Sequence, residues 1–215
     1  MADRYPGYDV LAKRYSPSWN EQTRQVVDAR LSLDPTAHLF FSDEEWPTVR
    51  AISARIVPQP TSGPERVPVA ALIDRKLHAD AGDGYRDARL PPMGEAWRRA
   101  LRAIDGEAAA RHRRRFHDCA AAEQDALLRV VQAGDARDPA WGDMPPAVFF
   151  TERLLHDIVT AYYAHPAAWS EIGFGGPAGP RGYVRMNYDR RDPWEAAEAK
   201  PGHEDEARRD NARVG

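Results

Sequence analysis

The residue types that most often carry catalysis occur in this chain, but not in the patterns that catalysis requires. The 215 residues contain no Walker phosphate loop, no nucleophile elbow and no HExxH zinc helix. The one cysteine, Cys119, excludes an internal disulfide and a cysteine zinc cluster. We interpret it as a small packing residue, with a reactive thiol as the alternative. His112 and His117 are five residues apart, which on a helix turns them away from a shared metal ion.

The spacing of two further histidines favours surface pairing over metal binding. A di-iron bundle needs Glu-x-x-His pairs, whose side chains share one helix face, and the sequence has none. Asp74 and His78 are four residues apart, as are Glu152 and His156. This spacing predicts pairs on a helix surface. The sequence therefore predicts no metal site.

Two other motifs have weak functional interpretations. Gly173–Ala178 matches the dinucleotide fingerprint GxGxxA, which needs a strand before it and a helix N-terminus after it. Here a helix is expected before the motif, and Pro177 and Pro180 disfavour a helix at its end, so we expect no cofactor site. Arg111–Arg115, RHRRR, is the one concentrated basic patch, but acidic residues come after it and the net charge is −3. A solvated helix face or a protein-docking patch is the favoured interpretation.

The segment from His165 to Met186 has an unusual composition for a solvated linker. It combines five glycines and three prolines with Trp169, Phe174 and Tyr183. Glycine lets a backbone approach another surface, proline lowers its freedom before docking, and aromatic and arginine side chains are typical interface anchors. We therefore predict partner binding here, by His165, Pro166, Trp169, Gly173, Phe174, Gly175, Gly176, Arg181 and Tyr183. The alternative is a loop that packs on its own domain, and both can hold if its two faces differ.

Helical signals dominate the regions that must position these residues. Ser18 and Ser42 each stand three residues before a glutamate, the spacing of a capping box. No segment shows sustained two-residue alternation, so the fold is predicted to be all-α, with about six helices in one irregular bundle. The first two expected helices begin at Ser18 and at Ser42, and the second of them ends near Pro58. Further helices are expected from Pro68 to Gly82, over Met93–Gly106 and from Pro145 to just before His165. One or two helices are expected over Ala108–Gly134.

Composition predicts one helical domain with two flanking segments. The hydrophobic share of 42 % is sufficient for a core, and no apolar run is long enough to span a membrane. We expect an N-terminal arm over residues 1–17, a helical domain over 18–188 that ends in a long ordered Gly/Pro-rich loop, and a charged tail over 189–215. The tail has 14 charged residues in 27 and lacks Leu, Ile and Phe, so it is expected to be largely disordered, with Trp194 as its only aromatic residue. The strong preference for arginine over lysine indicates a GC-rich bacterial genome.

Several of these motifs together resemble one family. Its opening is similar to Phe40-Phe41-Ser42-x-x-Glu45, Ile52-x-x-Arg55-Ile56-Val57-Pro58 and Val69-x-x-Leu72-Ile73-Asp74, and its middle to Phe116 and Gln124-x-x-Leu127-Leu128. Its C-terminal part, the more specific one, is similar to Phe149-Phe150, Tyr162-Tyr163-x-His165-Pro166, Trp169-x-Glu171-Ile172-Gly173-Phe174-Gly175-Gly176-Pro177 and Pro180-Arg181-Gly182-Tyr183. Over Leu39 to Arg185 the chain resembles the gluconate 2-dehydrogenase subunit 3 family.

The resemblance implies an accessory role. Members of this family are small helical subunits of flavin-dependent sugar or polyol dehydrogenases of the glucose-methanol-choline type, and the large subunit carries FAD and the chemistry. The small subunit is associated with the folding, stability or export of its partner. The resemblance brings no catalytic, cofactor-binding or metal-binding residues to this chain. Many relatives begin with a twin-arginine export signal that is not seen here, so we expect a cytoplasmic complex, or export together with a signal-bearing partner.

Two functions of other classes remain as alternatives. One is an independent enzyme that uses His165, Glu171, Arg181 and Tyr183 in a pocket under the glycine-rich loop. The other is a nucleic-acid-binding helical module that uses Arg111–Arg115. Turnover of a sugar by the isolated chain would favour the first, and salt-dependent binding to duplex DNA would favour the second.

Overall fold

The computed structural model describes residues 3–60, 66–177 and 195–213. Within these ranges every regular element is helical and no β-strand occurs, which confirms the predicted all-α class. The described residues contain nine α-helices, α1–α9, where about six were expected. No helix in these ranges combines the length and the apolar character that crossing a bilayer requires. The chain divides into two compact units, residues 34–162, and residues 1–33 together with 163–215.

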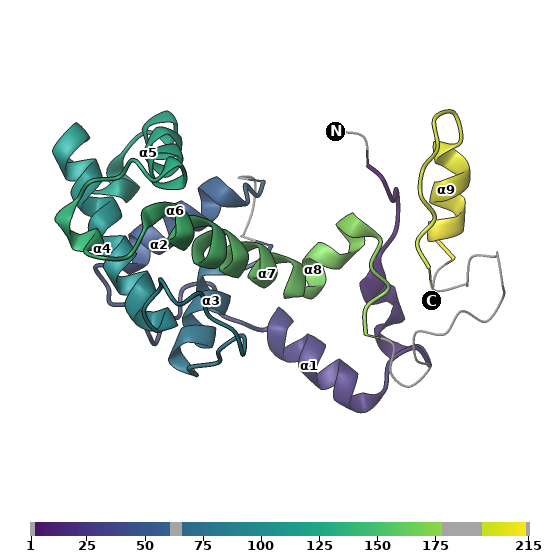
Figure 1. Cartoon of the computed structure of the whole chain (residues 1–215). Helices are drawn as coiled ribbons and strands as arrows, with labels where there is room; N and C mark the ends of the chain where they lie inside the picture. Colours follow the sequence, from purple (N-terminus) through teal and green to yellow (C-terminus); the bar gives the residue numbers. More distant parts are fainter. Residues whose placement is uncertain (1–2, 61–65, 178–194, 214–215) are drawn as a thin grey trace. The chain divides into compact units, whose positions relative to one another are not determined.

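The unit of residues 34–162 contains α2 to α6 and most of α7 (Figure 1). Helix α4 packs on α5 and α6, and α2 packs on α3 and α5. Its core is rich in aromatic rings, because Trp97 meets Phe41 and Phe149 edge to face at 6.0 and 5.7 Å. The elements are α2 (Trp46–Ile56), α3 (Val69–His78), α4 (Met93–His112), η2 (Phe116–Asp118), α5 (Ala121–Ala133), η3 (Pro139–Trp141), α6 (Pro146–Phe149), η4 (Phe150–Leu155) and α7 (His156–Ala164).

The two predicted capping boxes have different outcomes. The Ser42 pair forms: the N–H of Ser42 donates to the Glu45 carboxylate at 3.0 Å, and the N–H of Glu45 donates to Ser42 Oγ at 3.3 Å. The Ser18 pair is wrong, because α1 (Glu21–Leu31) is capped by Asn20, whose side chain accepts the N–H of Thr23 at 2.9 Å. Asparagine satisfies the free amides of a first turn as well as serine does, so the box spacing alone did not decide the cap.

Helix α4 runs past the stop that Gly106 was expected to provide. It continues to His112 and ends where Arg113 adopts a left-handed conformation, with φ of 58°. Gly106 is needed for packing instead, because a Cβ atom there would lie 2.0 Å from a carboxylate oxygen of Asp138. Of the two predictions for Ala108–Gly134, two helices rather than one is correct, since η2 separates α4 from α5.

The last helical stretch of this unit contains an irregularity that periodicity does not predict. As expected, it begins at Pro145-Pro146, and α7 ends just before His165. Between α6 and α7, however, η4 forms a π-helix, which is rare and occurs often at functional sites. This turn displaces Glu152 and Arg153 relative to a regular helix, and both side chains line a surface hollow.

The unit formed by residues 1–33 and 163–215 gathers segments from both ends of the chain. Its described elements are η1 (Val10–Tyr15), α1 (Glu21–Leu31), α8 (Pro166–Trp169), η5 (Ser170–Ile172) and α9 (Glu204–Asn211). Tyr8, Val10, Trp19, Val27 and Trp169 form its buried core. The predicted N-terminal arm therefore contributes two core residues to this unit. The expectation of a long irregular loop after His165 is corrected over residues 166–172, which form α8 and η5.

The expectation of a largely disordered tail is wrong over Glu204–Asn211, which form α9. Asn211 is buried, and its side-chain amide donates to the carbonyl oxygens of Pro6 and Ala197 at 3.0 and 2.9 Å. A charged composition predicts disorder, yet a short helix forms here, and Asn211 and Ala207 are its buried side chains. The boundary at residue 188 and Trp194 lie outside the described residues.

Candidate functional site

Asp74 is a buried carboxylate of the 34–162 unit whose partners are backbone N–H groups. It lies on α3 with no solvent exposure. Its oxygens accept the backbone N–H groups of Leu39, Phe40 and Phe41 at 2.6, 2.9 and 2.9 Å. The predicted surface pair of Asp74 with His78 is therefore wrong, because the carboxylate faces the interior and holds a turn. Hydrogen bonds to a charged acceptor are strong, so this turn is held rigidly.

Two acidic residues of α4 hold other loops in the same way. The Glu107 carboxylate accepts the N–H groups of Arg137 and Asp138, and its second oxygen pairs with Arg111 at 3.0 Å. Asp105 accepts the N–H of Phe116 at 3.0 Å. These carboxylates are occupied by the protein's own backbone, so they are not available to bind or activate a substrate.

Thr48, Asp105 and His117 form an arrangement that resembles the hydroxyl, base and acid of a hydrolase. Thr48 Oγ1 lies 3.1 Å from Asp105 Oδ1 and 3.2 Å from His117 Nδ1, and His117 Nε2 lies 3.5 Å from Asp118. The hydroxyl is fully buried, however, and a nucleophile must reach its substrate. The arrangement therefore joins α2, α4 and η2, and His117 is engaged here rather than with His112.

A charged cluster surrounds Asp157 at the start of α7. Asp157 is fully buried and accepts the indole N–H of Trp97 at 2.8 Å and a hydrogen from Lys76 Nζ at 3.0 Å. The same ammonium group lies 2.6 Å from Asp83, which also pairs with Arg153 at 3.1 Å. Although burial opposes ionisation, the hydrogen bonds and charges of these two cations lower the pKa of Asp83 below its ordinary value.

Asp83, His156 and Asp157 place one ligand atom each within 4.8 Å of one another, the spacing of a metal site. Lys76 bonds to both carboxylates and so takes the position that a cation would occupy. The donor set consequently does not fit a metal ion. His156 Nε2 lies 3.7 Å from Asp83, so the predicted pair of His156 with Glu152 is replaced by one across the loop.

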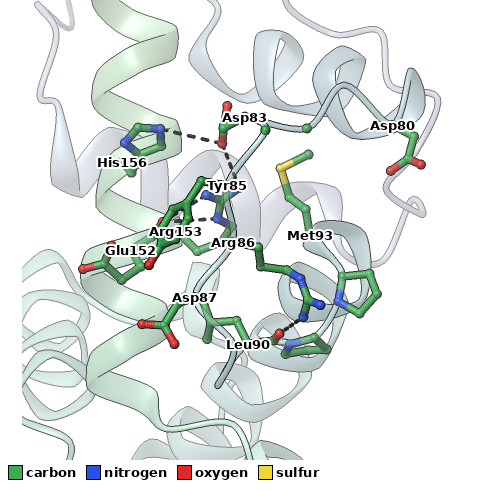
Figure 2. A pocket seen from close by; sticks show the side chains of 14 residues that line it. Asp80, Asp83, Tyr85, Arg86, Asp87, Leu90, Met93, Glu152, Arg153 and His156 are labelled. Carbon is green, nitrogen blue, oxygen red and sulfur yellow. Dashed lines mark hydrogen bonds and ion pairs between the residues drawn. The ribbon is translucent and has the colours of Figure 1, made fainter.

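This cluster forms one wall of a surface hollow with a volume of about 570 Å³, which we call the first hollow (Figure 2). Glu152, Arg153 and His156 approach it from η4 and α7, and the loop between α3 and α4 supplies the other side. Leu90 and Met93 contribute apolar surface, and Arg86 donates to the carbonyl oxygen of Leu90. The volume falls within the range of ligand pockets, and its lining mixes apolar and charged groups.

In the other unit, His165 serves as a structural connector. It is 2 % exposed, its Nε2 lies 3.0 Å from the carbonyl oxygen of Arg30, and its Nδ1 accepts the N–H of Ala167 at 3.2 Å. Burial lowers the pKa of His165. The ring is therefore the N-cap of α8, and both of its nitrogens are engaged by backbone groups. This occupancy argues against His165 as an acid–base group of an independent enzyme.

Trp169 and Phe174 belong to a row of edge-to-face aromatic rings that extends from the core to the surface. Trp169 is buried, lies edge to face on Trp19 at 6.3 Å, and donates its indole N–H to the carbonyl of Tyr163 at 2.9 Å. Phe174 packs edge to face on Trp169 at 5.4 Å and is 37 % exposed. Ile172 is 45 % exposed. The segment thus has an inward side, which packs on its own unit, and an outward apolar side.

The glycines of this segment are required by backbone conformation and close packing. Gly173 and Gly176 have φ of 65° and 73°, and a Cβ atom on either would lie 2.6 Å from the ring of Tyr5 or Trp19. The Gly175 carbonyl accepts a hydrogen bond from Lys13 at 3.4 Å. A helical turn, η5, precedes the GxGxxA motif, where the dinucleotide fingerprint needs a strand. Its glycines therefore serve close approach to the protein's own aromatic rings.

The remaining predicted partner-binding residues have different positions. Pro166 is buried at the first position of α8, whereas Arg181 and Tyr183 lie outside the described residues. Cys119 is buried, and burial raises the pKa of its thiol, which fits the packing interpretation. In the basic patch, Arg111, Arg114 and Arg115 pair with acidic side chains.

Comparison with known proteins identifies one family. Residues 43–176, more than half of the chain, match the family model described as gluconate 2-dehydrogenase subunit 3. The matched span includes the first hollow and ends within the glycine-rich segment. No curated protein and no solved structure matches the chain.

Proposed function

The chain belongs to the gluconate 2-dehydrogenase subunit 3 family, and we propose that it is a non-catalytic small subunit that binds and stabilises an FAD-dependent sugar or polyol oxidoreductase. The family match over residues 43–176 carries this proposal. The geometry supports it, because Asp74, Asp105 and Glu107 bond to the chain's own backbone. These groups build a rigid scaffold, which is what a binding subunit needs.

The proposed partner is a large subunit of the glucose-methanol-choline type, which carries the FAD and the catalytic residues. On this view the small chain contributes surface. The outward side of the glycine-rich segment is the first candidate for that surface, because Phe174 and Ile172 present apolar side chains to solvent and the Phe174 ring packs on buried Trp169. An anchor supported by a buried aromatic ring meets a partner with little loss of conformational freedom.

Co-expression with an FAD-dependent large subunit of the glucose-methanol-choline type from the same organism tests this function. We expect the two chains to copurify, the soluble yield of both to rise, and the flavin absorption band to appear in the complex. The small chain purified alone should be colourless and should not oxidise sugars with an artificial electron acceptor. Flavin bound to the isolated small chain, or sugar turnover by it, would overturn the non-catalytic role. Two chains that are equally soluble apart and do not associate would overturn the partnership.

A further inference from the structure

Ion pairs account for most of the charge in and behind the first hollow. Three acidic side chains are matched by three basic ones: Asp83 and Asp157 by Lys76 and Arg153, and Asp87 by Arg89. The lining charges left without an ion pair among the residues that the structure describes are mixed in sign: Asp80, Arg86 and Glu152. The hollow therefore has no large surplus of either charge that would select an ion as its ligand.

The same three side chains keep hydrogen-bonding capacity that the protein does not use. Within the described part of the chain, the carboxylates of Asp80 and Glu152 accept no hydrogen bond. Arg86 donates one hydrogen bond, to the carbonyl oxygen of Leu90, so most of its five N–H groups stay available. The hollow thus offers both acceptors and donors. A hydroxyl group donates and accepts, so a ligand with several hydroxyls uses both kinds of group without carrying a charge.

The hollow also offers apolar surface, which a small inorganic ion would leave unused. Tyr85 belongs to its lining with 76 % of the residue exposed, and Leu90 and Met93 add aliphatic surface. The C–H groups of a sugar ring, or of the carbon chain of an open polyol, pack on an aromatic ring in the way that aliphatic side chains do. A ligand that combines hydroxyls with such a carbon skeleton matches both parts of the lining.

Both walls of the hollow are fixed in the absence of a ligand. Gly84, with φ of 75°, provides the turn before Tyr85, and Asp83 holds the same loop through two ion pairs at 2.6 and 3.1 Å. On the other wall, the π-helix η4 carries Glu152, and π-helical turns occur often at functional sites. A hollow of about 570 Å³ with fixed walls loses little conformational entropy when it binds a small molecule.

We propose that the first hollow binds a neutral polyhydroxylated compound, a sugar or a polyol. Its hydroxyls bond to Glu152 and Arg86, and its carbon skeleton packs on Tyr85. This inference goes beyond the proposed function, because a subunit that only stabilises its partner needs no sugar site of its own. It also requires no large subunit, so the site can be tested on the isolated chain.

The test is a ligand-observed NMR titration of the full-length small subunit. The probes are D-glucose and sorbitol, with gluconate and glucosamine as a negatively and a positively charged analogue of similar size. The variants are Tyr85→Ala and Glu152→Ala. Matched controls are Tyr15→Ala, which removes a tyrosine that is 82 % exposed, and Glu44→Ala, which removes a carboxylate whose side chain is 83 % exposed. All four side chains are exposed, so each variant should keep the unfolding transition of the wild type.

We expect D-glucose, sorbitol or both to bind the wild type with a Kd of about 1–10 mM, the range typical of a ligand with about twelve non-hydrogen atoms. Tyr85→Ala and Glu152→Ala should each weaken binding about tenfold, while both controls stay within about twofold of the wild type. The two charged analogues should bind no more than about threefold more tightly than D-glucose, because the hollow has no large surplus of charge.

Three results would overturn the inference and leave the proposed function standing. The first is no binding of D-glucose or sorbitol at about 100 mM. The second is gluconate or glucosamine bound more than tenfold more tightly than D-glucose, which would identify the hollow as a site for an ion. The third is binding that both hollow variants retain. In that case, loss of binding in Leu39→Ser would place the sugar in a second hollow of about 580 Å³, which Leu39 and Phe40 line.

Discussion

Trp169 and Phe174 lie in ring contact but are predicted to affect different properties of the protein. Trp169 is 3 % exposed, and its indole N–H donates to the Tyr163 carbonyl. Replacing a buried tryptophan with alanine removes a large apolar surface and leaves a cavity, at a cost of about 3–5 kcal/mol. The orphaned Tyr163 carbonyl adds about 1 kcal/mol. Set against a typical free energy of unfolding of about 5–15 kcal/mol, Trp169→Ala should leave the N- and C-terminal unit close to unfolding.

Phe174→Ala should have the opposite profile. Its side chain is 37 % exposed, so less apolar surface is uncovered than with Trp169, and the free energy of unfolding should fall by about 1–2 kcal/mol. As an interface anchor, however, its removal should cost about 2 kcal/mol of binding, which is roughly a thirtyfold loss of affinity for the large subunit. Val26→Ala on α1, also an exposed apolar residue at 52 %, is the matched control and should leave both quantities unchanged.

The assay measures both quantities on the wild type and on the same three variants. Urea unfolding followed by far-UV circular dichroism gives the stability, and surface-immobilised large subunit gives the affinity. If Trp169→Ala unfolds at the urea concentration of the wild type, the packing of Trp169 on Trp19 is wrong. If Phe174→Ala binds as tightly as the control, the outward side of the segment is not a contact surface, and Trp169 acts only within its own unit.

Three further perturbations test the scaffold. Asp74→Ala should lower the free energy of unfolding by about 3 kcal/mol, because three backbone N–H groups lose a buried charged acceptor. Hydrogen exchange at Leu39 should accelerate, and Asp74→Asn should recover part of the loss. Burial lowers the folded-state pKa of His165, so the unfolded chain binds the proton more readily. The contribution of His165 to stability is therefore fully present above about pH 6.5 and is lost as the pH falls below that value. His165→Asn, which can still cap α8, should lack this pH-dependent contribution in unfolding curves. Gly176→Ala should lower the free energy of unfolding by about 2 kcal/mol or more, because a Cβ atom there combines a positive φ with a clash against Trp19. Gly202→Ala is the control: its φ is similar but the space around it is open, so the cost should be about 1 kcal/mol in the same urea titration.

The sequence predicted those parts of the fold that depend on local spacing. Apolar residues three and four apart located the helices that begin near Ser42, Pro68 and Pro145, and prolines marked the two later starts and the end near Pro58. The expected stop at Gly82 is wrong, because α3 already ends at His78. Gly106 misled the same reasoning, because glycine signals a helix end when its conformation is needed and a close contact when its lack of a side chain is needed. Only the position of Asp138, 32 residues further on, distinguishes the two cases.

The site was less predictable because its chemistry is assembled from residues far apart in the chain. Spacing of four residues predicted that Asp74 pairs with His78, yet its real partners lie 33 to 35 residues earlier, and nothing in the spacing connects the two segments. Composition did distinguish the segment from His165 to Met186, for which partner binding stays a prediction. It could not show which side of the segment faces inward, because that depends on Tyr5 and Trp19 at the other end of the sequence.

Buried carboxylates explain why a chain rich in acidic and histidine side chains presents so little exposed chemistry. A carboxylate inside a protein is stable only when hydrogen-bond donors or cations surround it, and one that serves a loop must receive backbone N–H groups in fixed positions. Asp74 and Glu107 each meet this requirement, and each fixes a loop that has no regular element of its own. The consequence is that the turn at Leu39–Phe41 and the loop at Arg137–Asp138 are held in place by hydrogen bonds to charged acceptors. Loops held in this way keep their shape without a partner, which lowers the conformational entropy lost when a partner binds them.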